Sequence, residues 1–97
     1  MRLLTRHRPD ADELTARCVA ADRLVGERVA ALARASDGHL AEPDSGRAFA
    51  VFEAAEELLY LAEYEQRKAR AALQRARKRR RFERASEDGA RTTGSPP

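Results

Sequence analysis

The chain has 97 residues and a formal net charge of +3, with 36% charged and only 5% aromatic residues. A chain of this length forms at most one domain, and it buries only about 60% of the surface that its unfolded form exposes. Its longest apolar runs, such as residues 29–33, fall far short of the ~20 residues of a membrane-spanning helix, so the composition excludes such a span.

Residues 1–9 are basic, and we expect them to form a loose arm. Asp10 followed by Glu13 fits a capping box, in which the Asp10 side chain accepts a hydrogen bond from the Glu13 amide. A helix over residues 10–36 is predicted next, because apolar residues recur there every three or four positions on one face. The residues of that face are Leu14, Cys18, Ala21, Val25, Val29 and Leu32.

Two glycines bear on this first helix. Gly38 is expected to end it by adopting the left-handed conformation, which a residue without a Cβ atom reaches without a steric penalty. Gly26 lies in its middle, where the usual compensation for the lost helix propensity is the close approach of a partner helix. A short connection over residues 39–44 then leads to Ser45, which we expect to be the next N-cap.

The second predicted helix, residues 45–88, contains no proline and repeats alanine at every seventh position. Ala48, Ala55, Ala62, Ala69 and Ala76 alternate with Phe52, Leu59, Gln66, Leu73 and Arg80. Such alternating steps of three and four are typical of a coiled-coil seam. We therefore predict an all-α fold: an antiparallel two-helix hairpin with an extended second helix, coiled-coil-like and completed by self-association. The tail, residues 89–97, is expected to be disordered.

The two helices differ in length, spanning about 39 Å and about 63 Å at 1.5 Å per residue. If Ser36 lies opposite Gly46, Asp10 lies near Ala72. The sequence thus predicts a projecting overhang over residues 73–87.

Charge is unevenly distributed along the second helix. Residues 45–66 hold one basic and five acidic side chains, whereas residues 67–84 hold ten basic and one acidic. Arg17 and Arg28 of the first helix are expected to pair with the acidic half across the hairpin.

The basic half favours contact with DNA or RNA, because arginine-rich helices bind phosphates through charge and counterion release. Cations surround the helix, so we expect binding without sequence specificity. The predicted phosphate contacts are Arg75, Arg77, Lys78, Arg79, Arg80, Arg81 and Arg84. In this hypothesis the protein is a non-catalytic helical assembly or adaptor module.

An alternative is a protein-interaction or scaffold module, in which the basic half pairs antiparallel with acidic residues of another copy or of an acidic partner protein. Packing or oligomerisation would use Leu59, Tyr60, Leu61 and Tyr64. A third interpretation is a plain helix whose terminal cations suit the macrodipole and solubility.

No chemistry-bearing motif is recognisable. The Glu-x-x-His pattern of helical di-iron sites is absent, and glycines lack the spacing of a phosphate-binding loop. Cys18 falls on the apolar face and cannot form an intramolecular disulfide. We therefore expect no enzyme, no metal site and no cofactor. The single cysteine, together with the lack of a recognisable signal peptide, favours a cytoplasmic location.

Overall fold

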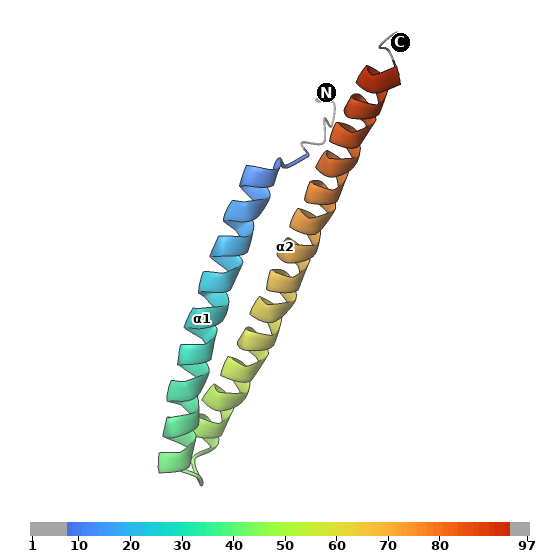
Figure 1. Ribbon diagram of the computed structural model, residues 1–97. Coiled ribbons are helices and arrows are strands. Elements are labelled where there is room, and N and C mark those ends of the chain that lie inside the picture. Colours follow the sequence, from blue (N-terminus) through green and yellow to red (C-terminus); the bar gives the residue numbers. More distant parts are fainter. Residues whose placement is uncertain (1–7, 94–97) are drawn as a thin grey trace, which may run out of the picture.

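The computed structural model describes residues 8–93, without the side chains of residues 90–93, and consists of two antiparallel helices (Figure 1). These are α1 (Ala11–Ala41) and α2 (Gly46–Thr93), joined by a turn at residues 42–45. The molecule measures 81 × 41 × 14 Å. Since a helix with its side chains is about 10–12 Å across, the thickness corresponds to one layer of helices. The all-α hairpin predicted from the sequence is therefore what the chain forms.

Both helices begin at the predicted N-caps. The Glu13 amide donates to Asp10 Oδ1 at 2.8 Å, and the Ala48 amide donates to Ser45 Oγ at 3.1 Å. Each bond satisfies one of the amide groups that a helix start leaves without an intrahelical partner.

The structure describes only parts of the predicted N-terminal arm and C-terminal tail. Most of the predicted basic arm, residues 1–7, lies outside the described residues, as do residues 94–97 of the predicted tail. Residues 89–93 of that tail continue α2 as helix instead of being disordered.

The expectation that α1 ends near Ser36 is wrong, because the helix continues through Gly38 to Ala41. No residue of the described chain has a positive φ angle, so Gly38 does not act as a left-handed terminator. The additional turn brings the His39 ring 5.7 Å from the Phe52 ring, in a stacked arrangement, and 5.4 Å from the Phe49 ring. Packing of these three rings explains why the helix extends.

The longer α1 shifts the register of the hairpin. Asp10 and Ala11 lie beside Arg79 and Arg80, not beside Ala72 as expected. The shift follows from the late turn, since each residue added to α1 moves its start toward the C-terminal end of α2.

The predicted overhang is therefore shorter than residues 73–87. Leu73 is only 8% exposed, because it packs in the seam between the helices. The projecting part of α2 begins near Arg81 and runs to Thr93, a length of about 20 Å.

The core is thin, and its buried side chains are Leu14, Ala35, Ala62 and Leu73. Half-buried residues continue the seam along both helices, and Cys18 is one of them, as predicted.

Two details of the predicted α1 face are wrong. Val29 is 50% exposed, and Arg28 takes its place in the seam as a half-buried residue. The aliphatic stem of an arginine can cover an apolar neighbour while its charged head stays in water. Gly26 does not accommodate a partner helix either, since a Cβ atom built there would meet nothing within 4 Å.

Candidate nucleic-acid interface

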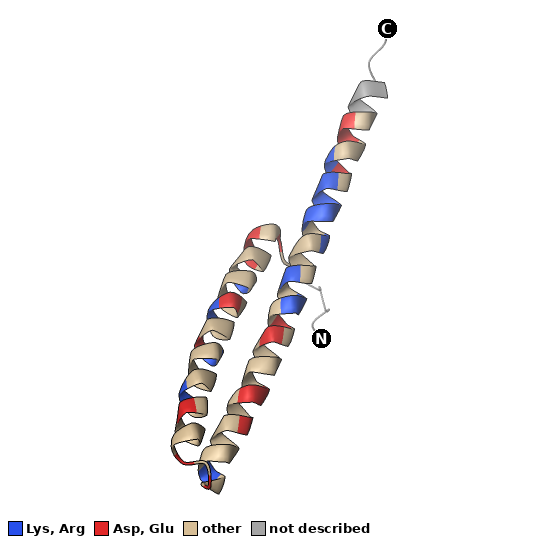
Figure 2. Ribbon diagram, turned by 60° about the horizontal axis from the view of Figure 1, so that its bottom comes forward, with Lys and Arg blue, Asp and Glu red and all other residues tan. Residues whose placement is uncertain are grey.

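The basic segment of α2, residues 75–84, holds all the predicted phosphate contacts. Every one of these side chains is exposed: Arg75, Arg77, Lys78, Arg79, Arg80, Arg81 and Arg84. Figure 2 shows acidic residues on the part of α2 nearer the turn and basic residues on the part beyond them. The segment straddles the point where α1 begins, so only its last residues belong to the projecting helix.

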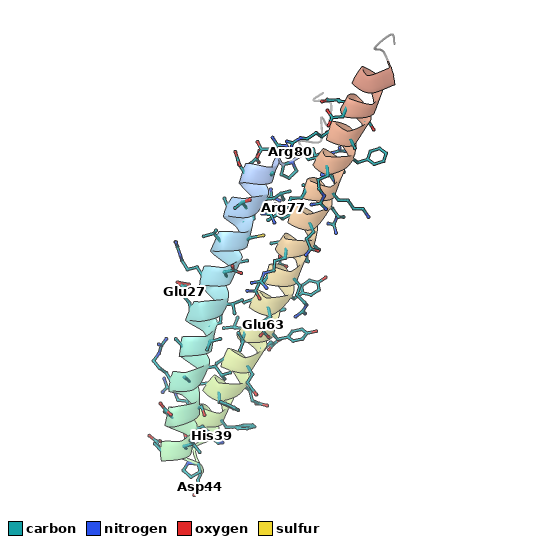
Figure 3. The ribbon with its side chains drawn as sticks, in the orientation of Figure 1. Glu27, His39, Asp44, Glu63, Arg77 and Arg80 are labelled. Atoms are coloured by element: carbon teal, nitrogen blue, oxygen red, sulfur yellow. The ribbon has the colours of Figure 1, made fainter. Side chains whose placement is uncertain are left out.

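The cations lie on more than one side of the helix. Figure 3 places Arg77 and Arg80 on the side of α2 that faces α1, and Arg84 follows Arg80 by four residues on that side. Farther from that side, Arg75, Lys78 and Arg79 surround an exposed Phe82 in one shallow depression that also includes Glu83. Arg75 and Arg79 also border α1, beside Leu14 and Asp10 respectively. The structure therefore does not gather the cations on one face but spreads them around the helix.

Within residues 8–93, none of the cations of the basic segment forms an ion pair. Two ion pairs lie closer to the turn, between Lys68 and Glu65 and between Arg70 and Asp22. Phe82, beside three of these cations, is 72% exposed. The segment thus presents cations that are open to an external anion, with one aromatic ring among them.

A polar layer interrupts the seam at Gln66, one of the residues that alternate with the alanine heptad. Gln66 Nε2 donates to Asp22 Oδ1 at 2.8 Å, and Arg70 Nη2 donates to the same oxygen at 3.0 Å. The Gln66 hydrogen bond, together with the charge and hydrogen bond of Arg70, lowers the pKa of Asp22 against a smaller opposing effect of desolvation. These contacts link α1 to α2 at mid-length, and their effect on stability is small because Asp22 and Arg70 remain exposed.

The predicted pairing of Arg17 and Arg28 with the acidic half is not found in the described chain. Sequence reasoning had missed the Asp22–Arg70 pair instead. The available signal was Asp22, an acidic residue one position after Ala21 of the apolar face.

The residues predicted for packing or oligomerisation do not form one surface. Leu59 is half-buried in the seam against α1, whereas Tyr60, Leu61 and Tyr64 are 62%, 50% and 49% exposed. Lys68 Nζ lies 5.4 Å from the centre of the Tyr64 ring, in a cation–π contact. The exposed three lie on α2 away from the seam and are available to an external partner.

The described residues contain no group of three or more His, Cys, Asp and Glu side chains that could hold a metal ion. Nor does any described helix have the length and apolar character to cross a membrane. Comparison of the chain with protein families, with curated proteins and with solved structures gives no match.

Proposed function

We propose that the protein is a non-catalytic helical module that binds the phosphates of DNA or RNA through the basic segment of α2, without sequence specificity. The observation that carries this proposal is the set of exposed cations on residues 75–84, which have no acidic partner within the described chain. Cations in this state release condensed counterions when they neutralise phosphates, which is the main source of sequence-independent affinity.

The placement of the cations suits a groove better than a flat surface. A helix with its side chains is about 10–12 Å across, close to the roughly 12 Å width of the major groove of DNA. Arg81 and Arg84, on the projecting helix, would face the phosphates of the groove. Arg75, Arg77 and Lys78 lie where α2 still runs beside α1, and they would contact phosphates outside the groove. Phe82 would add a stacking surface for an unpaired base.

The test is a salt titration of binding to a random-sequence duplex and to single-stranded RNA. We expect the logarithm of the binding constant to fall linearly with the logarithm of the salt concentration. On a duplex, the slope should be about −0.9 for each phosphate contacted. Changing Arg77, Arg80, Arg81 and Arg84 together to glutamine should reduce that slope by about three to four. All these side chains are exposed, so the fold should persist.

A matched control removes the same charge elsewhere, through glutamine at Arg23, Arg34, Arg47 and Arg67, which are all exposed. This variant should keep the wild-type slope, because its arginines lie away from the basic segment. No binding at 50 mM salt, a flat salt response, or equal losses in the two variants would overturn the proposal.

A second candidate function is a protein-interaction module, cytoplasmic like the first, in which the basic segment pairs with an acidic helix of another copy or partner. It is favoured by the exposure of Tyr60, Leu61 and Tyr64, since contiguous exposed apolar side chains usually mark an interface. Sedimentation of the wild type beside Leu61→Glu tests it. The wild type should sediment as an oligomer and the variant as a smaller species, whereas two unchanged monomers would contradict this function.

A further inference from the structure

We propose that the interaction partner is a second copy of this chain, packed antiparallel along the outer strip of α2 in a register centred on Gln66. The outer strip is the set of α2 residues reached from Ala50 to Phe82 by alternating steps of four and three. This inference rests on the second candidate function, because it specifies the occupant and geometry of that interface.

The outer strip is a second heptad pattern on α2. The seam toward α1 uses residues such as Ala55 and Leu59, and the strip is displaced from it by about half a helical turn. Its members are exposed except for Ala71, which is half-buried. A second copy placed there would pack mainly on α2, and it would border α1 where Lys68, Ala71 and Arg75 line a depression together with Leu14 and Arg17.

Charge is complementary in the antiparallel register. With Gln66 as the centre, Glu57 of one copy lies opposite Arg75 of the other, and the symmetry of the pair repeats this contact. Glu53 flanks the strip, and Arg81 of the second copy lies two residues along the helix from the position opposite Glu53. Glu53 and Glu57 form no ion pair within the described chain. A parallel in-register pair would instead place Glu57 against Glu57 and Arg75 against Arg75.

Side-chain size is complementary about the same centre. Phe82, 72% exposed, lies opposite Ala50, and Leu61 lies opposite Ala71. A large residue against a small one allows two helices to interdigitate without a void.

Close to the centre, Tyr64 lies opposite Lys68 of the second copy. Within one chain Lys68 is already 5.4 Å from the centre of the Tyr64 ring, so each ring could be contacted by an ammonium group from either copy. Charge, size and cation–π contacts therefore share one centre of symmetry. An unrelated acidic helix would satisfy only the basic half of the strip and would leave Glu57 and Leu61 uncovered.

The outer strip leaves one side of the basic segment free. Arg77, Arg80 and Arg84 lie on the side that faces α1 and do not belong to the strip. A dimer of this geometry would therefore keep cations available for phosphates.

The test is a charge swap measured by sedimentation equilibrium on nuclease-treated full-length protein. Glu57→Arg and Arg75→Glu should each raise the dimer dissociation constant by about tenfold or more, because each places like charges together twice. The double variant restores both contacts and should return to within about threefold of the wild type. Glu56→Arg, one position off the strip, is the matched control and should leave the constant unchanged.

Disulfide trapping fixes the register independently, on a Cys18→Ala background. A mixture of an Ala54→Cys copy and a Lys78→Cys copy should cross-link on oxidation, because these positions lie opposite each other. Neither variant alone should cross-link, since its own cysteines would be about 36 Å apart.

The outcomes distinguish the existence of the dimer from its register. A wild type that stays monomeric at all concentrations overturns both this dimer and the second candidate function. A dimer that ignores the charge reversals, or that cross-links in the single-variant samples, overturns the register alone. Binding to duplex by a protein that stays monomeric would favour the first candidate function over the second.

Discussion

The helix α2 is continuous, but its two parts, residues 46–80 and 81–93, are stabilised by different interactions. The first part packs on α1 through a seam that buries Ala62 and Leu73 and contains the Asp22–Gln66 polar layer. Within residues 8–93, the second part has no neighbouring helix beyond Glu83, which borders the start of α1, and its described side chains are exposed. A helix of about 13 residues without tertiary contacts is marginal in water. Burial therefore stabilises the first part, while helix propensity and charge stabilise the second.

The largest expected effect comes from two apolar truncations on either side of this boundary. Leu73→Ala should lower the free energy of unfolding by about 2–3 kcal/mol, because it leaves a cavity in an already thin core. Phe82→Ala, in the projecting part, should change it by less than about 0.5 kcal/mol. Urea unfolding followed by circular dichroism measures both. Equal effects would mean that Leu73 does not belong to the packed part.

A smaller effect is expected from two glycine substitutions, since neither site would crowd an added Cβ atom. Gly26→Ala lies in α1 and should raise the free energy of unfolding by about 0.5–1 kcal/mol. Gly89→Ala lies in the projecting helix and should increase helical content without moving the urea midpoint. A higher midpoint in the second variant would show that the projecting helix unfolds together with the hairpin.

The smallest expected effect is the loss of the contribution that Asp22 makes to stability as the pH falls. Folding lowers the pKa of Asp22 below the ordinary aspartate value of about 3.9, so its stabilisation is present above that value. It is lost as the pH falls through the lowered pKa. The difference in Tm between wild type and Asp22→Asn should therefore be largest near neutral pH and shrink below about pH 4. A difference that is constant from neutral pH to pH 2 would argue against this role.

Much of the fold was predictable because its signals are local. The caps at Asp10 and Ser45 depend on short-range hydrogen bonds, and the alanine heptad through Ala62 sets the α2 seam from sequence spacing alone. The exposure of the predicted phosphate contacts also follows from sequence, since seven cations within ten residues cannot be buried together.

The errors in the end of α1, in the register and in the pairing have one physical origin, which is that tertiary packing overrode a local signal. Gly38 was predicted to end the helix. The helix continues instead, and His39 gains two aromatic neighbours. The register of the hairpin shifts as a result. Arg28 is charged and was therefore left out of the apolar face, although its stem serves there. The Asp22–Arg70 pair depended on the correct register and could not be found before it.

The continuity of α2 has a consequence for the direction of its outermost cations. The helix passes from the seam into the projecting part without a break. The packing of the seam therefore sets the direction around the helix axis in which Arg84 points. One residue inserted after Arg80 would rotate Arg84 by about 100°, out of line with Arg77. Seven inserted residues would restore the phase and move Arg84 about 10 Å farther along the axis. Spacing and orientation of the cations are thus separable properties of a single helix.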